Sequence, residues 1–170
     1  MKRILSGVFA LVISALFAAC SGTAQTTGTD GERAGRRGIV RSETSLPHGT
    51  ALTIYRSPTC SCCKEYEAYL AAAGVEVNIV EIADVSAKKA ELGVPDAARS
   101  CHTSQLGDYV IEGHVPIEVL AKLLDEKPAL SGIGLPGMPA GAPGMGTPKE
   151  GPLHIVSFDE GGTLAHYATV

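Results

Sequence analysis

The chain has 170 residues, enough for one domain of moderate size with appended segments. It contains no tryptophan and few aromatic residues, so we expect a core built from Val, Ile, Leu and Ala. Its formal net charge is −4, and loss of residues 1–19, which carry Lys2 and Arg3, would make it −6. This acidic balance argues against nucleic acid as a partner.

Residues 1–20 have the pattern of an export signal. A basic pair precedes a largely apolar stretch of 16 residues, 4–19, which is too short to span a bilayer comfortably. The stretch runs into Cys20 through Leu-Phe-Ala-Ala, which resembles the lipobox of bacterial lipoproteins, with Phe17 in place of the usual leucine. We expect a signal peptide with lipidation at Cys20; the alternative is cleavage nearby, after Ala24, which discards Cys20. Either route exports the chain to an oxidising compartment.

Residues 21–49 are predicted to be a disordered tether, because they are rich in Gly, Thr and Arg and show no apolar period. A basic cluster within them would also suit attraction to anionic lipid near an anchor, although a solvated tether is the interpretation we favour. This cluster consists of Arg33, Arg36, Arg37 and Arg41. The folded domain is therefore expected at residues 50–170.

The first part of this domain alternates between strand and helix patterns. Residues 51–55 form an apolar run typical of a strand, and the helix that follows has one apolar face and ends at Gly74. A second strand is predicted at residues 75–82 and a short helix at residues 86–92.

The next part of the domain is predicted to contain two strands and a helix. A turn at residues 107–108 precedes a strand at residues 109–111, and a helix begins at Pro116, a favoured first helical residue, and ends before Pro128. The order β-α-β-α followed by β-β-α is the thioredoxin-like order, and a cysteine turn at the start of the first helix belongs to that fold. We therefore predict an α/β, thioredoxin-like domain.

Residues 131–151 interrupt this pattern, because seven glycines and four prolines in 21 residues exclude helix and strand. Ordering their backbone costs roughly 1–2 kcal/mol per residue, more than burial of Leu135 and two methionines contributes. We expect this Gly/Pro-rich loop to fold over the cysteine turn, held by contacts to the domain or by bound metal. Residues 153–158 and 164–168 then predict a C-terminal β-hairpin.

Three cysteines, Cys60, Cys62 and Cys63, lie at the predicted strand-to-helix turn. Free N–H groups and the positive end of the helix dipole favour thiolate there, and Lys64 adds a positive charge. Cys60 and Cys63 have the spacing of a redox pair. Cys62 is about 100° round the helix from Cys63, so it points elsewhere unless the first turn is distorted. Thiolates splayed in this way suit several soft ions bridged by shared sulfurs better than one small tetrahedral ion.

Four motifs, in this order, resemble those of the periplasmic CopG-type copper-resistance proteins, a metal-binding family. They are Thr59-Cys-Ser-Cys-Cys-Lys64, Ser100-Cys-His-Thr103, Tyr109-Val-Ile-Glu-Gly-His-Val-Pro116 and Leu135-Pro-Gly-Met-Pro-Ala-Gly-Ala-Pro-Gly-Met145. The resemblance covers about residues 50–170. Two positions depart from the family pattern: Ser61 replaces the usual glycine between the first two cysteines, and Gly146 replaces the usual glutamate after the last methionine.

The resemblance implies a thioredoxin-like fold, a periplasmic location and a multinuclear, cysteine-bridged copper site with a proposed role in Cu(I)/Cu(II) interconversion. Carried over by position, the copper-binding cysteines are Cys60, Cys62, Cys63 and Cys101. The implied cargo is copper, several Cu(I) ions per chain, with other periplasmic copper-handling proteins as candidate partners. Whether the protein turns over as a copper oxidoreductase stays open, and no catalytic residue is assigned.

Further candidate ligands lie in the same motifs. His102 adjoins Cys101, and adjacent side chains on a strand face opposite ways, so only one of them can face the cluster unless the chain bends. His114 is a candidate ligand or a support for the loop through a hydrogen bond. Met138 and Met145 offer soft thioethers for Cu(I) binding or delivery, or else fill gaps in packing. The histidines that we interpret as lying outside the site are His48, His154 and His166.

Two other functions compete with copper handling. A thiol–disulfide oxidoreductase that uses Cys60 and Cys63 suits the fold and the compartment, but the additional Cys62 and Cys101 argue against a simple dithiol. A purely structural role would place the four domain cysteines in two disulfides, for which three pairings exist. One pairing requires a strained disulfide between the adjacent residues Cys62 and Cys63. None of the three pairings explains why three cysteines are clustered at one turn. Copper handling is therefore the leading hypothesis.

Overall fold

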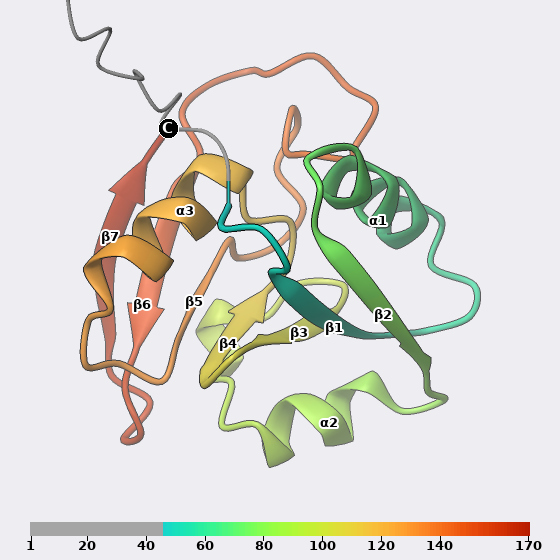
Figure 1. Ribbon diagram of the computed structural model, residues 1–170. Helices are drawn as coiled ribbons and strands as arrows, with labels where there is room; N and C mark the ends of the chain where they lie inside the picture. The colour runs from blue at the N-terminus through green and yellow to red at the C-terminus, as the bar shows by residue number, and fades with distance from the viewer. Residues whose placement is uncertain (1–45) are drawn as a thin grey trace, which may run out of the picture. The chain divides into compact units, whose positions relative to one another are not determined.

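A seven-stranded sheet organises residues 46–170, the part of the chain that the computed structural model describes (Figure 1). In chain order the elements are β1 (Ala51–Arg56), α1 (Ser61–Ala72), β2 (Glu76–Glu81), α2 (Val85–Glu91), the short 3₁₀ helix η1 (Asp96–Ala98), β3 (Thr103–Leu106), β4 (Tyr109–Glu112), α3 (Ile117–Glu126), β5 (Gly132–Gly134), β6 (His154–Phe158) and β7 (Leu164–Thr169). The domain is mixed α/β with a C-terminal hairpin, as predicted. Its sheet is larger than expected, because β5 is an additional strand.

The strand pairing brings distant segments to one place. The sheet order is β2-β1-β3-β4-β5-β6-β7, with β1 parallel to β2 and antiparallel to β3, and β3 antiparallel to β4. Thr103, the first residue of β3, pairs with Tyr55 of β1 on one side and with Glu112 of β4 on the other. The end of β1, the start of β3 and the end of β4 therefore lie together.

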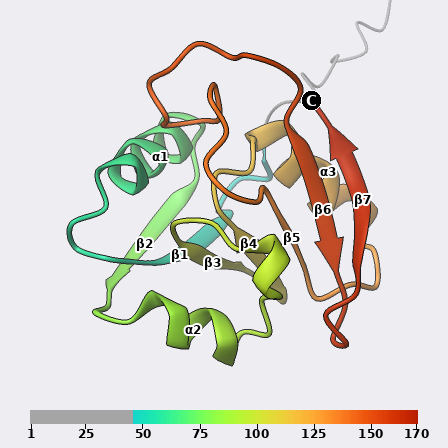
Figure 2. The same ribbon diagram turned by 180° about the vertical axis from the view of Figure 1, so that it is seen from behind.

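Two hydrophobic clusters of side chains pack against the sheet. Figures 1 and 2 show, from opposite sides, the helices and strands that carry them. The larger cluster joins α1 and α3 to the strands and includes Tyr66 and Leu120. The smaller cluster joins the segment around η1 to the strands through Val94, Ala98 and Phe158. Because helix α1 is buried on the strand side, its N-terminal turn is held rigidly beside the end of β1.

The predictions that concern the membrane fall largely outside the described structure. The export signal, Cys20 and the tether as far as residue 45 precede the described residues. Within residues 46–170, no helix is long and apolar enough to cross a membrane.

The prediction that residues 131–151 exclude strands is wrong for Gly132–Gly134, which form β5 between β4 and β6. The composition was misleading because glycine is normally unfavourable inside a strand. At Gly132, however, a Cβ atom would overlap the carbonyl oxygen of Val110 and lie 2.5 Å from the ring of Phe158. Ile133, between the two glycines, is fully buried. The close approach of neighbouring groups thus requires glycine in this interior strand.

The remainder of the loop, residues 135–152, has no helix or strand and lies against α1 (Figure 1). The N–H of Leu135 donates to the carbonyl oxygen of Glu112 at 3.0 Å. Gly144, with φ of +77°, comes so close to α1 that a Cβ atom there would lie 2.5 Å from the nitrogen of Tyr66. The loop therefore follows the expected route over the cysteine turn, held by contacts with the domain.

Replacement of Gly132 by alanine should lower the free energy of unfolding by about 1–3 kcal/mol, because the added methyl group overlaps Val110 and Phe158. Gly151→Ala is the matched control, since its Cβ meets no atom within 4 Å and its φ is not left-handed. Equilibrium urea unfolding of the two variants and the wild type measures the difference. Equal unfolding midpoints for both variants would contradict a requirement for glycine in β5.

Candidate metal centre

The cysteine turn lies between β1 and α1, with Cys60 as the N-cap residue of a helix that begins at Ser61. The sulfurs of Cys60 and Cys63 are joined in a disulfide, so the predicted redox pair is present in its oxidised form. Cys62 and Cys101 are free thiols and partly exposed. The interpretation with two disulfides among the four domain cysteines is therefore wrong for this form of the protein.

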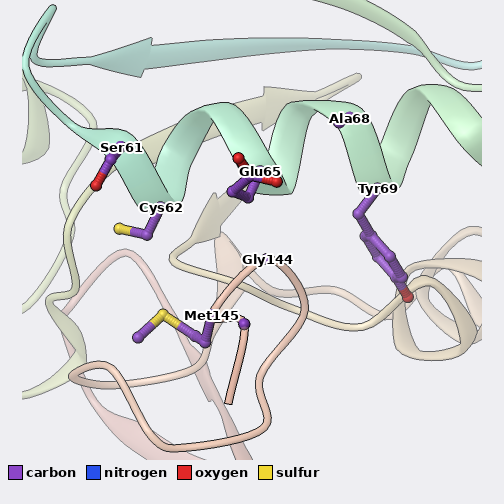
Figure 3. A pocket seen from close by; sticks show the side chains of 8 residues that line it. Ser61, Cys62, Glu65, Ala68, Tyr69, Gly144 and Met145 are labelled. Carbon is purple, nitrogen blue, oxygen red and sulfur yellow. The ribbon is translucent and has the colours of Figure 1, made fainter.

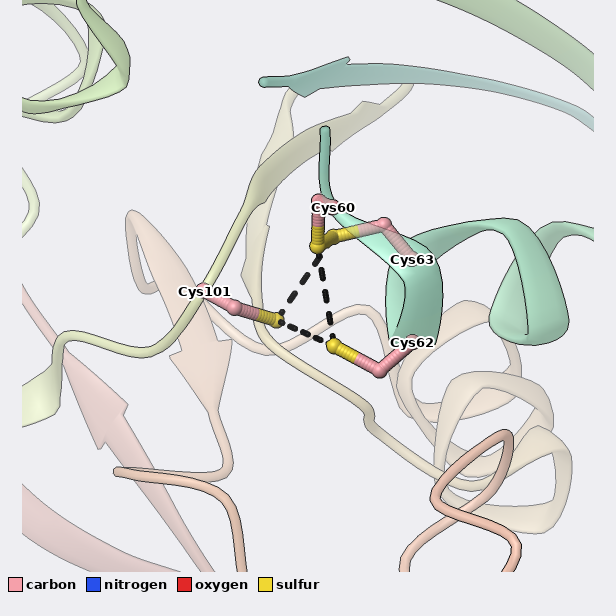
Figure 4. A group of neighbouring side chains, drawn as sticks. All are labelled: Cys60, Cys62, Cys63 and Cys101. Carbon is pink, nitrogen blue, oxygen red and sulfur yellow. Dashed lines mark hydrogen bonds between the residues drawn. A yellow bond between two sulfur atoms is a disulfide. The ribbon is translucent and has the colours of Figure 1, made fainter. Parts of the chain in front are cut away.

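The sulfur atoms of the four domain cysteines converge (Figure 4). The Sγ atom of Cys62 lies 3.6 Å from that of Cys60 and 3.9 Å from that of Cys101. The Sγ atom of Cys63 lies 3.7 Å from that of Cys101. Cys101 arrives from the segment before β3 and lies within reach of both helical cysteines. Cys62 therefore belongs to the cluster, although its position on the helix suggested that it would point elsewhere.

Cys101 and His102 both face the site because the chain bends before β3. The strand begins only at Thr103, so the alternation of side chains in a strand does not apply to the two preceding residues. The Nδ1 atom of His102 lies 3.3 Å from the Sγ atom of Cys101. The carbonyl oxygen of His102 accepts a hydrogen bond from the N–H of Gly113 at 3.1 Å. Of the two alternatives that the sequence left open, the bend is the one observed.

His114 completes a second group of donors, in which one atom from each side chain lies within 4.8 Å of the others: Cys63, Cys101, His102 and His114. Its Nε2 atom is 3.1 Å from the Sγ atom of Cys101, and its Nδ1 atom is 2.5 Å from the carbonyl oxygen of Pro143. Because a carbonyl oxygen only accepts, Nδ1 carries the proton and Nε2 presents its lone pair to the cysteines. A backbone carbonyl that orients an imidazole in this way is typical of metal-binding histidines.

Tyr66 closes the inner side of the site. Its ring centroid lies 5.1 Å from that of His102 and 4.9 Å from that of His114. The phenol is fully buried and donates to the carbonyl oxygen of Val115 at 2.7 Å. His102 is also fully buried, and its Nε2 atom has no hydrogen-bond partner. One side of the donor group is thus enclosed by buried side chains, and the other side, at Cys62, reaches the surface.

Burial favours the neutral forms of Cys101, His102 and His114. Burial raises the pKa of Cys101 to about 12, with a smaller contribution from Cys62. Burial also lowers the pKa of His102 well below its usual range, and neighbouring positive groups lower it further. The pKa of His114 is lowered by burial, an effect that the hydrogen bond to Pro143 opposes. Neutral imidazoles are ready to bind a metal, whereas the Cys101 thiol must lose its proton when it does.

An open pocket of about 540 Å³ lies beside Cys62, between α1 and the loop (Figure 3). Glu65 and Tyr69 of α1 line one side of it, and Met145 of the loop lines the other. Met138 does not line this pocket and is 58 % exposed. The loop therefore brings one of its two methionines, Met145, to the accessible side of the cysteines.

Three histidines that the sequence placed outside the site are exposed and belong to neither donor group: His48, His154 and His166. Two residues that the sequence analysis did not single out are buried near Cys101, namely Lys89 of α2 and Glu112 of β4, which form an ion pair. A carboxylate within the apolar strand pattern of β4 was a signal that could have identified Glu112. Lys89 gave no such signal, because lysine is common on short surface helices.

Comparisons with known proteins agree with this geometry. Residues 98–145 match a family model described as a protein of unknown function, DUF411. A search of curated proteins finds no match. Two solved structures titled copper resistance protein CopG, form 2 and form 1, are similar, with TM-scores of 0.67 and 0.66. Each is 36% identical in sequence and covers 72% of this chain, and the matches cover 99% and 98% of the two solved chains.

The likeness extends over nearly the whole length of the solved proteins and includes the region that carries the four cysteines and two histidines. Identity at this level indicates common descent and not only a shared fold. This chain belongs to the family of the copper resistance protein CopG.

Proposed function

We propose that this chain is an exported copper-binding protein that holds Cu(I) in a cysteine-bridged site and contributes to copper resistance. The observation that carries the proposal is the convergence of four sulfurs and two imidazoles in two overlapping groups. Soft thiolate and thioether ligands favour Cu(I) over hard cations. The proposed ligands are Cys60, Cys62, Cys63, Cys101, His102 and His114, with Met145 and, further out on the loop, Met138 for copper delivery.

The sulfur spacings support a site with more than one copper ion. Thiolates that share one soft ion at about 2.3 Å lie roughly 3.8 Å apart in trigonal or tetrahedral arrangements. In the disulfide form the separations of 3.6, 3.7 and 3.9 Å between neighbouring cysteines are already near this value, and opening of the Cys60–Cys63 bond would free both of its sulfurs to bind. Cys63 and Cys101 belong to both donor groups, so each can bridge two ions. We infer that the sulfurs bridge several Cu(I) ions and that the two imidazoles complete the coordination at the buried side.

Loading requires the disulfide to open. Two electrons and two protons from an external dithiol convert the Cys60–Cys63 disulfide into two thiols, while the dithiol becomes a disulfide. Each thiol that then binds copper as a thiolate releases a proton. In the opposite direction, oxidation of the two thiolates to the disulfide releases two electrons, which reduce two Cu(II) ions to Cu(I). We propose this exchange as the route of Cu(I)/Cu(II) interconversion.

The fold and the location complete the proposal. The sheet order β2-β1-β3-β4, with the cysteine turn before α1, supports a thioredoxin-like unit to which β5, β6 and β7 are added. We propose that the protein acts in the periplasm, attached to a membrane through a lipid on Cys20. Other periplasmic copper-handling proteins are the proposed exchange partners.

A thiol–disulfide oxidoreductase is the second candidate, favoured by the disulfide at the N-terminus of α1. Cys60 is partly exposed and Cys63 is fully buried, which suits an attacking and a resolving sulfur. The free thiol of Cys62, only 3.6 Å from Cys60, argues against it. That thiol would compete with Cys63 in resolving any mixed disulfide formed with a substrate.

The reduced protein should bind more than one Cu(I) ion per chain under anaerobic conditions. Cys62→Ser should lose much of this capacity, because Cys62 is near the sulfurs of both Cys60 and Cys101. Titration with Cu(I) against a competing chelator measures both values, with Ser61→Ala, an adjacent exposed position, as the matched control. Saturation of the wild type at a single ion would remove the multinuclear model. Strong insulin reduction by metal-free protein, retained in Cys62→Ser, would favour the oxidoreductase.

His114→Ala should raise the dissociation constant for Cu(I) by about 10- to 100-fold, because it removes the nitrogen directed at Cys101. His154→Ala is the matched control, since His154 is exposed and its side chain hydrogen-bonds to Thr169, outside both donor groups. Competition with a Cu(I) chelator gives both constants. Equal affinities in the two variants would limit His114 to holding the loop through Pro143.

Met145→Leu should slow copper uptake more than Met138→Leu does, because Met145 lines the pocket beside Cys62 and Met138 lies further out on the loop. Stopped-flow mixing of reduced protein with a Cu(I)–chelator complex measures the uptake rate. Hydrogen exchange should also show that copper protects the loop amides around Met145 in the wild type. Equal uptake rates and unchanged protection would assign Met145 to packing alone.

A further inference from the structure

Two exposed histidines at the open end of the β6–β7 hairpin converge on one oxygen atom. The Nε2 atom of His166 lies 2.9 Å from Oγ1 of Thr169, and the Nδ1 atom of His154 lies 3.3 Å from the same oxygen. All three side chains are exposed, and neither histidine belongs to the two donor groups around Cys101. Two imidazole nitrogens that meet at one point on the surface are an arrangement that a metal ion can use.

A β-bulge places the two histidines on the same face of the hairpin. The register shifts at Tyr167, an extra residue of β7 that pairs with no residue of β6. Without this shift, His166 and Thr169 are three positions apart and face opposite sides of the sheet. With it, His166 pairs with Val156, which is two residues from His154 and therefore on the same face. Thr169 pairs directly with His154. Bulges commonly redirect a side chain in this way near functional sites.

Tyr167 holds the bulge through contacts with α3. The Nζ atom of Lys122 lies 4.2 Å from the centroid of its ring, and its hydroxyl group donates to Oε2 of Glu126 at 3.4 Å. Tyr167 also packs against the larger hydrophobic cluster. Because the extra residue is directed at the helix, the bulge has a fixed position in β7, and His166 stays turned away from α3.

The convergence also has a purely structural interpretation, in which Thr169 bridges the two rings by hydrogen bonds. A threonine hydroxyl carries one proton, so one of the two nitrogens accepts and the other donates. Hydrogen bonds between exposed side chains contribute little to stability, because water offers the same partners. The bridge alone therefore gives little reason for a bulge that leaves a backbone position unpaired.

We propose that His154 and His166 form a second metal site, suited to Cu(II), with the hydroxyl group of Thr169 or water completing the coordination. Imidazole nitrogen and oxygen ligands suit Cu(II), which binds such sites more tightly than the other divalent ions of the first transition row. Metal–nitrogen bonds of about 2.0–2.1 Å require each ring to move inward by roughly 1 Å, which exposed side chains achieve by small rotations. The site offers no sulfur, so its preference is opposite to that of the cysteine cluster.

The proposed site lies far along the sheet from the cysteines. Strand β7 is one edge of the sheet, whereas β1, which leads into the cysteine turn, lies next to the opposite edge strand, β2 (Figures 1 and 2). The two sites share no side chain. Loss of the histidine pair should leave the Cu(I) affinity of the cysteine cluster unchanged, so this inference and the proposed function can fail separately.

The test uses the tag-free chain in its disulfide form with Cys62→Ser and Cys101→Ser, because the two free thiols would otherwise reduce or bind Cu(II). Cu(II) is titrated against glycine as the competing chelator into this protein and into three variants of it: His154→Ala, His166→Ala and His48→Ala. The third is the matched control, since His48 is exposed and outside both donor groups. Loss of either hairpin histidine should raise the dissociation constant at least about tenfold, because a chelating pair becomes a single ligand. The control should keep the original constant.

Equal dissociation constants in all four proteins would overturn the inference and limit the pair to a hydrogen-bonded bridge. An equal loss of affinity in His48→Ala would mean adventitious binding to any exposed imidazole, and would also overturn it.

A second measurement uses the wild type and applies if the serine variants do not fold. Ni(II), a paramagnetic ion that thiols do not reduce, is titrated into the disulfide form while the imidazole Cε1–H resonances are recorded by NMR. The resonances of His154 and His166 should broaden together, and before that of His48. Any other pattern, including broadening of one hairpin histidine alone, would overturn the pairing.

Discussion

The antiparallel pairing of β3 with β4 is the constraint on which the candidate metal centre depends. Thr103 opposite Glu112 makes the residues before β3 and after β4 neighbours, so Cys101 and His102 meet the segment that carries His114. The same Thr103 pairs with Tyr55, which brings the end of β1, and with it the cysteine turn, to the same place. A shift of one residue in this register would turn alternate side chains to the opposite face and separate the donors.

Helix α1 and the loop then complete the arrangement from opposite sides. Tyr66, from the helix, packs against the imidazoles of His102 and His114. From the loop, the carbonyl oxygen of Pro143 accepts a hydrogen bond from the protonated Nδ1 atom of His114. The loop is therefore more than a cover, because its backbone carbonyl selects the tautomer of a candidate ligand. This contact links the position of the Gly/Pro-rich loop to the chemistry of the site, because a change in the loop would alter which nitrogen of His114 carries the proton.

The element types and the cysteine turn were predictable from sequence because they depend on local patterns: apolar periodicity, helix-ending glycine and the spacing of Cys60 and Cys63. The features that were not predictable depend on tertiary contacts. Gly132 is unfavourable in an isolated strand but necessary beside Val110 and Phe158. The bend that lets Cys101 and His102 face one site begins just before β3, and no local pattern locates that boundary. The pairing of Lys89 with Glu112 joins two elements far apart in the chain.

The disulfide and the copper site use the same sulfurs, so they exclude each other. While Cys60 and Cys63 are bonded, Cys62 and Cys101 are the two thiols among the four cysteines that the structure describes, and Cys63 cannot serve both donor groups as a thiolate. In an oxidising compartment the bonded form is favoured unless copper or a reductant competes for the sulfurs. Under the proposed function, Cu(I) would stabilise the open form by binding its thiolates, which would link copper occupancy to thiol oxidation by mass action. The arrangement of four cysteines, two in a redox-spaced pair and two beside it, would then couple copper binding to electron transfer without a separate redox centre.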